Sequence, residues 1–231
     1  MKNIAIIPAR SGSKGLVDKN IKELLGNPLL SYSIDAAKKS GLFDKIFLST
    51  DSVHYAEIGK RYGADVSFLR SEAMASDVAG SWDVVKEVIH TWEERGEYYD
   101  TITLLQPTSP LRSDEDIRAA FQLLIDKDAH SVVSVCEAEH SPLWCDVLPP
   151  DGCMDHFGEQ QESDCPRQML PTYYRINGAI YLIKRDELNR LEMFRDKSYA
   201  YIMPRERSVD IDEEMDFMLA ELIMKQRMEN Q

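Results

Sequence analysis

Three basic side chains and two glycines lie in one short loop near the start of the chain. Residues 9–20 read Ala-Arg-Ser-Gly-Ser-Lys-Gly-Leu-Val-Asp-Lys-Asn. Glycine lets main-chain N–H groups approach a phosphate, and Arg10, Lys14 and Lys19 add positive charge. Gly12 and Gly15 are three residues apart with no Lys-Ser pair after them, which excludes the Walker A and GxGxxG patterns. The loop predicts an anion site of another type, and a solvated basic loop is the alternative.

Two aspartates, Asp210 and Asp212, lie two residues apart in a segment that leads into a predicted helix. Side chains two residues apart in extended chain point to one side, so both carboxylates can hold a hard divalent cation. A helix cap explains the same residues, with Asp210 as N-cap and Glu213 at N3. The local sequence leaves cap and metal site evenly balanced. Glu214 and Asp216, like Glu213, are assigned to the helix dipole and solvent.

A polar side chain, Gln106, ends a hydrophobic run and precedes a turn with two prolines, in the sequence Leu-Leu-Gln-Pro-Thr-Ser-Pro-Leu-Arg of residues 104–112. Its amide can donate and accept hydrogen bonds to a polar ligand, although a plain turn would look the same. The five histidines do not cluster at the spacing of metal ligands. No GxSxG motif occurs and no cysteine lies beside an evident base, so covalent nucleophilic catalysis has little support.

The elements that must position these residues alternate between short apolar runs and helical patterns, which predicts βαβ units and a mainly parallel sheet. The predicted strands are Ile4–Pro8, Lys45–Thr50, Val66–Leu69, Thr101–Gln106, Ser131–Cys136, Ala179–Ile183 and Ala200–Met203. The predicted helices are Pro28–Ser40, Val53–Tyr62, Trp82–Glu94 and Glu115–Asp126, followed by a helix near the C-terminal end. Gly41 and Gly63 are placed as helix stops, and Ser113 with Asp116 resembles a capping box.

The last predicted helix carries a stripe of apolar residues at helical spacing. Met215, Met218, Leu219, Leu222 and Ile223 follow the i, i+3, i+4, i+7, i+8 pattern of one helix face. Such a stripe usually packs against a core, so we expect these methionines to be buried.

Residues 138–172 interrupt the alternation. This stretch holds five of the ten prolines and three of the four cysteines, without clear periodicity. A long excursion from a compact domain is usually functional, and Trp144, Phe157 and Met169 supply apolar anchors. We therefore expect an ordered arm, either a lid or a dimerisation arm.

Composition describes an ordinary soluble protein of 231 residues, 43% hydrophobic and 29% charged, and predicts a single domain over residues 1–231. The net charge of −13 argues against nucleic-acid and anionic-membrane partners, whereas residues 1–22 carry five basic residues and one acid. No apolar run is long enough to span a membrane. The four cysteines fit no zinc or redox spacing and are predicted to be free thiols, which favours the cytoplasm.

Taken in order along nearly the whole chain, these motifs resemble the CMP-N-acetylneuraminate synthetase (acylneuraminate cytidylyltransferase) family. The motifs are Arg10-Ser-Gly-Ser-Lys-Gly15 with Lys19-Asn20, Ser49-Thr-Asp51, Ala75-Ser-Asp77, Leu105-Gln-Pro-Thr-Ser-Pro-Leu-Arg112, Asn177-Gly-Ala-Ile-Tyr181 and Asp210-Ile-Asp212. The resemblance implies a three-layer, nucleotide-diphosphosugar-transferase-like α/β fold and a homodimer formed with the 138–172 arm. It also implies Mg²⁺-dependent transfer of CMP from CTP to a nonulosonic acid, with release of pyrophosphate.

The resemblance also assigns roles to single residues. It places the nucleotide at Arg10, Ser13, Lys14, Gly15, Lys19, Asn20, Arg70 and Ser81. It places the sugar at Gln106 and Tyr181, and at Arg167, which the arm would deliver to the partner's site. Lys19, Arg10, Asp210 and Asp212 would be catalytic, and the two aspartates would hold Mg²⁺, which moves the balance from cap toward metal site.

Two departures from the family pattern concern the sugar. Trp144 stands where one sialic-acid branch has a lysine, and Met193-Phe194 replaces an aromatic pair expected near the N-acyl group. A more apolar nonulosonate such as legionaminic or pseudaminic acid would suit these changes, while Trp144 as a plain anchor of the arm explains them equally well. A non-catalytic nucleotide-sugar binding module and a purely structural domain are the hypotheses from other classes.

Overall fold

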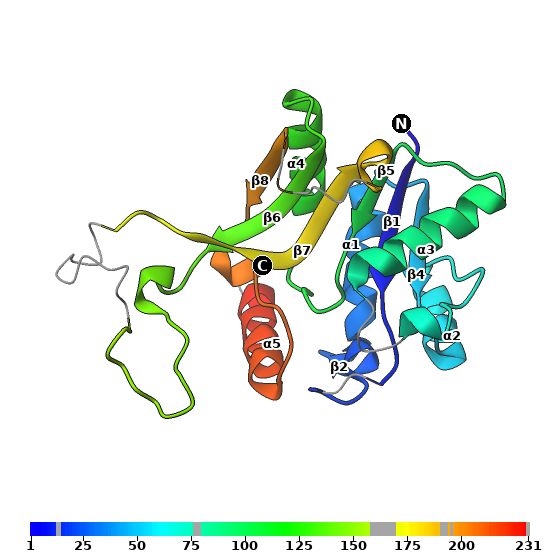
Figure 1. The fold of residues 1–231 in the computed structure, drawn as a ribbon. Helices are drawn as coiled ribbons and strands as arrows, with labels where there is room; N and C mark the ends of the chain where they lie inside the picture. The colour runs from blue at the N-terminus through cyan, green and yellow to red at the C-terminus, as the bar shows by residue number, and fades with distance from the viewer. Residues whose placement is uncertain (13–14, 76–79, 158–169, 190–193, 195, 230–231) are drawn as a thin grey trace.

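The computed structural model describes residues 1–12, 15–75, 80–157, 170–189, 194 and 196–229 (Figure 1). Its strands are β1 (Asn3–Pro8), β2 (Glu23–Leu24), β3 (Asn27–Pro28), β4 (Lys45–Ser49), β5 (Thr101–Leu104), β6 (Ser131–Glu137), β7 (Tyr174–Lys184) and β8 (Ser198–Ile202). Its α-helices are α1 (Leu29–Ser40), α2 (Val53–Tyr62), α3 (Ser81–Glu94), α4 (Asp114–Asp126) and α5 (Glu214–Glu229).

Six strands form the central sheet in the order β4-β1-β5-β7-β6-β8. β1 pairs in parallel with β4 and β5, and β6 pairs in parallel with β8. β7 runs antiparallel between β5 and β6, so it alone opposes the direction of the other five. The prediction of a mainly parallel sheet is confirmed, and the antiparallel β7 joins its two parallel parts.

Helices cover both faces of the sheet, because successive residues of a strand point to opposite sides. Ala5 and Ile7 of β1 belong to a core that includes residues of α1, α2 and α4. Ile4 and Ile6 belong to a second core with α3. The predicted three-layer arrangement is therefore confirmed, and Figure 1 shows helices on either side of the strands.

Helix boundaries follow the local signals closely. α2 spans Val53–Tyr62 as predicted, with the Ser52 Oγ atom accepting the Tyr55 N–H at 3.3 Å. The capping box at α4 is present, since Ser113 Oγ accepts the Asp116 N–H at 3.2 Å and Asp116 Oδ2 accepts the Ser113 N–H at 2.9 Å. Side-chain caps of this kind satisfy the orphan N–H groups of a helix start.

The predicted burial of the α5 stripe is wrong for four of its five residues, and Ile223 is partly buried against the core. Met215, Met218, Leu219 and Leu222 are exposed, and Phe217 and Ala220 are the residues that α5 buries. The helix is apolar on several sides, so periodicity alone does not select the face that meets the core. Contacts with Leu24, Leu29, Leu111 and Ile211 in a third small core decide the face instead.

The prediction of a strand at Val66–Leu69 is also wrong. The single bridge here joins Phe47 to Asp65, just before the segment, and residues 66–69 contain bends and no strand or bridge. The apolar residues are still used, because Val66 is buried and the Phe68 ring lies 4.5 Å from the Phe47 ring. Side-chain packing rather than a hydrogen-bond ladder accounts for the apolar pattern here.

The described part of the predicted arm, residues 138–157 and 170–172, extends away from the sheet beyond β6 and β7 (Figure 1). Apart from a short 3₁₀ turn at Pro142–Trp144, it has no regular structure in its described part. Among the residues that the structure describes, no helix combines the length and apolarity needed to cross a bilayer.

Candidate active site

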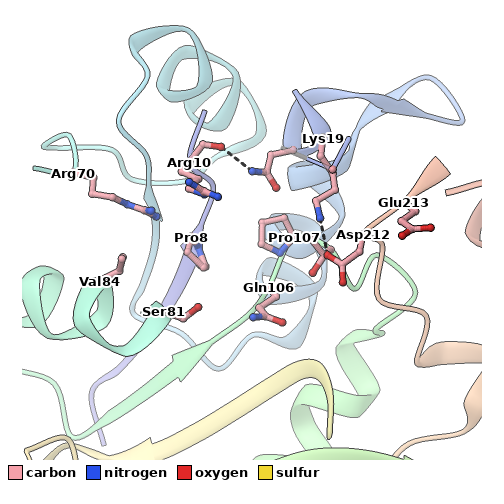
Figure 2. Close-up of a pocket in the computed structure, with 13 residues that line it drawn as sticks. Pro8, Arg10, Lys19, Arg70, Ser81, Val84, Gln106, Pro107, Asp212 and Glu213 are labelled. Carbon is pink, nitrogen blue, oxygen red and sulfur yellow. Dashed lines mark hydrogen bonds and ion pairs between the residues drawn. The ribbon is translucent and has the colours of Figure 1, made fainter. Parts of the chain in front are cut away.

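A cavity of about 440 Å³ lies where β1 and β5 end (Figure 2). Its lining comprises Pro8, Arg10, Gly15, Lys19, Asn20, Arg70, Ser81, Val84, Gln106, Pro107, Thr108, Asp212 and Glu213. Open α/β sheets bind ligands beyond the carboxyl ends of their strands, because main-chain groups and loops converge there. The cavity therefore lies where the fold favours a ligand site.

The structure brings eight of the residues singled out in the sequence to this cavity: Arg10, Gly15, Lys19, Asn20, Arg70, Ser81, Gln106 and Asp212. Tyr181 and Asp210 are not among the lining residues. Ser13, Lys14 and Arg167 lie outside the described residues. Sequence reasoning did not single out Pro8, Val84, Pro107 or Thr108, because apolar and small polar residues in the wall of a cavity carry no chemical signal of their own. Glu213, which also lines the cavity, was assigned to the helix dipole and solvent.

The loop that follows β1 is held in shape by Asp51, which follows β4. Asp51 Oδ1 accepts the Ser11 N–H at 2.8 Å, and Oδ2 accepts the Ser11 hydroxyl at 2.6 Å. Burial raises the pKa of Asp51, but the two bonds from Ser11 outweigh it and keep the pKa below its ordinary value. The Asn20 amide donates to the Arg10 carbonyl at 3.0 Å, which closes the loop on itself.

Lys19 connects the basic loop to the acidic segment before α5. Its Nζ atom donates to the Ile211 carbonyl at 2.6 Å and to Asp212 Oδ1 at 3.0 Å, the latter drawn as a dashed line in Figure 2. The loop also approaches this segment through Gly15, where a Cβ atom would come within 2.9 Å of the Asp212 carbonyl oxygen. Two segments almost 200 residues apart in sequence therefore form one wall of the cavity.

Arg70 supplies a second, more buried cation on the opposite side. Only 8% of its surface is exposed, and its guanidinium donates to Ser49 Oγ at 3.1 Å and to the Ser49 carbonyl at 2.8 Å. Burial lowers the pKa of Arg70 to about 10, while the charges of Asp51 and Glu87 act the other way. The group stays charged at neutral pH and is fixed by the end of β4.

Asp210 does not cap α5, which corrects one of the two interpretations of this residue. The helix starts at Glu214, and Asp216 Oδ2 accepts the N–H groups of Asp212 and Glu213 at 3.0 and 2.9 Å. Asp210 Oδ1 is buried with no hydrogen-bond partner among the described residues. Burial raises the pKa of Asp210, although a hydrogen bond from Thr108 opposes this.

Tyr181 lies on β7 close enough to Asp210 for the carboxylate charge to affect it. Burial raises the pKa of the Tyr181 phenol, and the charge of Asp210 adds to this. Its ring meets Trp82 edge to face, with the ring centres 6.1 Å apart. Trp82, at the start of α3, thus forms an apolar wall beside the predicted sugar contact.

No cluster of three or more His, Cys, Asp or Glu side chains suited to a metal occurs in the described part of the chain, and Asp210 and Asp212 are the carboxylates that the sequence singled out for one. Mg²⁺ in nucleotide sites is usually held by one or two carboxylates, with phosphate oxygens and waters completing its shell. An unpartnered buried oxygen on Asp210, with Asp212 two residues further on, fits that donor set. The cavity thus combines three cationic side chains (Arg10, Lys19 and Arg70) with the amides of Asn20 and Gln106 and the carboxylates of Asp212 and Glu213, and Asp210 lies outside its lining.

Known proteins show clear likenesses to this chain. The profile of a family described as cytidylyltransferase matches residues 4–144. An N-acylneuraminate cytidylyltransferase of Streptococcus agalactiae serotype V is 40% identical over 94% of this chain, which spans 52% of that relative's length. The CMP-N,N'-diacetyllegionaminic acid synthase of Legionella pneumophila is 33% identical over 97% of both chains. The chain thus spans about half the length of the streptococcal relative and nearly all of the Legionella one.

The fold has a solved counterpart in a CMP-2-keto-3-deoxy-manno-octonic acid synthetase complexed with CTP. The two structures superpose with a TM-score of 0.73, covering 98% of this chain and all of the other, at 15% identity. An identity this low carries information on the fold alone, and that fold is the nucleotidyltransferase-like α/β arrangement predicted from the sequence.

Proposed function

The chain belongs to the cytidylyltransferase family, and from this membership we propose that it transfers CMP from CTP to a nonulosonic acid and releases pyrophosphate. The acceptor is N-acetylneuraminate or a relative of it, and the reacting group is the anomeric hydroxyl. The observation that carries this proposal is the cavity itself, in which the basic loop, Gln106 and Asp212 face one space.

The proposed division of labour follows the walls of the cavity. Arg10, Gly15, Lys19 and Asn20, with Ser13 and Lys14 of the same loop, bind the triphosphate, while Arg70 and Ser81 hold the nucleotide. Gln106 and Tyr181 contact the sugar. Charge on Lys19 and Arg10 counters the negative charge that accumulates on the leaving pyrophosphate, which is the main electrostatic demand of this reaction.

In the proposed reaction, the anomeric oxygen attacks the α-phosphorus of CTP in line with the α,β-bridging oxygen. The new P–O bond forms as the old one breaks, the electron pair leaves with pyrophosphate, and an aspartate of the Asp210 and Asp212 pair takes the hydroxyl proton. Asp210 and Asp212 would also hold Mg²⁺, because the unpartnered buried oxygen of Asp210 provides a ligand position. Bound there, Mg²⁺ would offset phosphate charge.

We further propose that the chain is one domain over residues 1–231 and acts in the cytoplasm as a homodimer, with the 138–172 arm at the interface and Arg167 reaching the partner's site. Exposed apolar residues on three elements support a partner copy: Trp144 and Val147 of the arm, Ile176 of β7, and Met218 and Leu222 of α5. Among the described residues the free thiols of Cys136, Cys145 and Cys153 suit a reducing compartment.

A change of Leu222→Asp tests the dimer, because it places a charge on the exposed α5 stripe without touching the core. We expect sedimentation at the monomer mass, whereas Val53→Asp, at an exposed apolar position on α2, leaves the dimer intact. A wild-type chain that sediments as a monomer would contradict the proposed assembly.

The acceptor is tested by pyrophosphate release from the purified protein with Mg²⁺ and CTP. N-acetylneuraminic, legionaminic, pseudaminic and octulosonic acids are offered in parallel, with GTP in place of CTP as the control. We expect release with CTP and one nonulosonate only. Preference for legionaminic acid would match the end-to-end likeness to the Legionella synthase. CTP binding without release from any acceptor would favour a non-catalytic binding module.

A further inference from the structure

The central strand β7 contains a bulge at the residues that face Gln106 and Asp210. Val133 of β6 pairs with Tyr181 of β7, but Val135 pairs with Ile176, so a single β6 residue lies opposite four β7 residues, 177–180. Extra residues in one strand break the ladder and redirect side chains, and such bulges are frequent beside active sites.

Side chains take over the hydrogen bonds that the ladder loses in this bulge. The Ser134 hydroxyl accepts the Ile180 N–H at 2.7 Å and donates to Asn177 Oδ1 at 2.6 Å. The Asn177 amide donates to Ser208 Oγ at 2.9 Å, two residues before Asp210. Buried polar groups that are fully paired in this way hold a single local conformation.

Arg112 fixes the same bulge from the turn that follows β5. It is 3% exposed, and its Nη1 atom donates to the Ala179 carbonyl at 2.9 Å and to the Gln106 carbonyl at 3.3 Å. The Ile211 N–H donates to the Thr108 carbonyl at 2.8 Å, so the segment that carries Asp210 is tied to the same turn. The main chain next to Gly178 and Asp210 is therefore tied, through Arg112 and through Thr108, to the turn that begins at Gln106.

Gly178 lies at the centre of this arrangement, and its missing side chain leaves the space that the two functional groups occupy. Its φ of 75° lies in the left-handed region. A Cβ atom there would overlap Gln106 Oε1 and come within 3.1 Å of Asp210 Oδ2. Both polar groups thus lie against the Cα of a buried glycine.

We propose that Gly178 is a positioning residue for the transfer reaction: by leaving room for the Gln106 amide and the Asp210 carboxylate side by side, the β7 bulge sets how the acceptor sugar is held. This inference rests on the proposed function. Gly178 does not line the cavity, so it acts through these two side chains and not on the nucleotide.

The test is Gly178→Ala, compared with Gly96→Ala. Gly96 has a φ of 78°, almost that of Gly178, but a Cβ atom there would have no heavy atom within 4 Å, so it shares the backbone strain without the clash. We expect Gly178→Ala to lose about 100-fold in kcat/KM for the acceptor, while its Kd for CTP, measured by calorimetry without Mg²⁺ so that Asp210 takes no part in nucleotide binding, changes by less than about twofold. Gly96→Ala keeps wild-type values of both.

A double-mutant cycle separates positioning from general damage. Gln106→Ala removes the atom that the methyl group would overlap, so Gly178→Ala should cost less in that background than in the wild type. Additive losses, or a loss of CTP affinity in Gly178→Ala equal to the loss in acceptor kcat/KM, would overturn the inference.

A second variant tests the inference if the Gly178→Ala protein does not fold. Ser134→Ala loosens the bulge without adding an atom, and we expect it to raise KM for the acceptor about 5- to 10-fold with CTP binding unchanged. Wild-type acceptor kinetics in Ser134→Ala would overturn the inference. If the wild-type protein releases no pyrophosphate with any acceptor, the proposed function is contradicted instead. Failure of the inference and failure of the proposed function therefore give different results.

Discussion

The loop after β1 lines the cavity, the bulge of β7 lies behind Gln106 of its wall, and the two regions are positioned in opposite ways. The loop is shaped by itself and by one carboxylate, through the Asn20 bond to Arg10 and the Asp51 bonds to Ser11. The bulge is shaped by Ser134, Arg112 and Ser208, which come from three distant elements. Apart from the Lys19 bonds to Ile211 and Asp212, the loop is therefore held by a contact within itself and by one carboxylate 40 residues away, whereas the proposed acceptor site needs the assembled sheet.

The largest effect that this comparison predicts comes from Lys19→Ala, because Lys19 joins the two sides through Ile211 and Asp212. We expect turnover to fall at least about 1000-fold with the fold intact, since one preorganised cation is lost where charge develops. Pyrophosphate release and circular dichroism measure the two quantities.

Lys22→Ala is the matched control for that change. Its Nζ atom also forms an ion pair with an acidic residue at the start of α5, at 2.5 Å from Glu214 Oε2. Unlike Lys19, Lys22 does not line the cavity. Activity close to wild type is expected for Lys22→Ala. Near wild-type turnover in Lys19→Ala would show that the two sides work without this link.

A smaller effect, confined to the nucleotide side, is expected for Asp51→Asn. The amide cannot accept both Ser11 donors, so the loop loses one charge-assisted hydrogen bond. We expect the Kd for CTP to rise about tenfold, while KM for the acceptor stays near wild type at saturating CTP. This pattern is the reverse of that expected for Gly178→Ala, and equal losses for both substrates would remove the distinction between the two sides.

The sequence predicts the loop side of this comparison well because its signals are local. Glycine and basic residues directly after a buried strand predict an anion site there, and Gly63 marked the end of α2. Resemblance to a family added Arg70 and Ser81, which have no local pattern, and the structure places both at the cavity.

The other side could not be predicted residue by residue, because its contacts join segments far apart in sequence. Arg112 and Gly178 belong to two of the sequence motifs, but their roles depend on the β7 bulge, which forms only when β6 and β7 pair. The exposed stripe of α5 had the periodicity of a core helix, and only tertiary contacts show that Phe217 is buried instead. Periodicity finds a helix with several apolar sides but does not choose among them.

The smallest effect on activity is expected for Asp116→Asn, outside both sides of the cavity. Asp116 is fully buried and accepts two bonds from Arg207, at 2.8 and 3.0 Å. Burial raises the pKa of Asp116, but the hydrogen bonds from Arg207 and Ser113 lower it by more, so the pKa lies below its ordinary value. Its stabilisation is thus present above about pH 4 and is lost as the pH falls through the native pKa.

We therefore expect Asp116→Asn to keep wild-type kinetics while the free energy of unfolding falls by about 2 kcal/mol at pH 7. The difference from the wild type should begin to shrink below about pH 4 and should be lost once the pH falls below the lowered native pKa of Asp116, where both proteins carry an uncharged side chain. Denaturant unfolding at several pH values measures this. A difference that grows in acid would contradict the direction of the pKa shift.

The central claim is that the cavity joins CMP to a nonulosonic acid, and mass spectrometry of the reaction product tests it most directly. With CTP, Mg²⁺ and the acceptor that supports pyrophosphate release, we predict one new species with the mass of the acceptor linked to CMP, absent from Lys19→Ala. Pyrophosphate release without that conjugate, or a conjugate that Lys19→Ala forms as readily, would contradict the account.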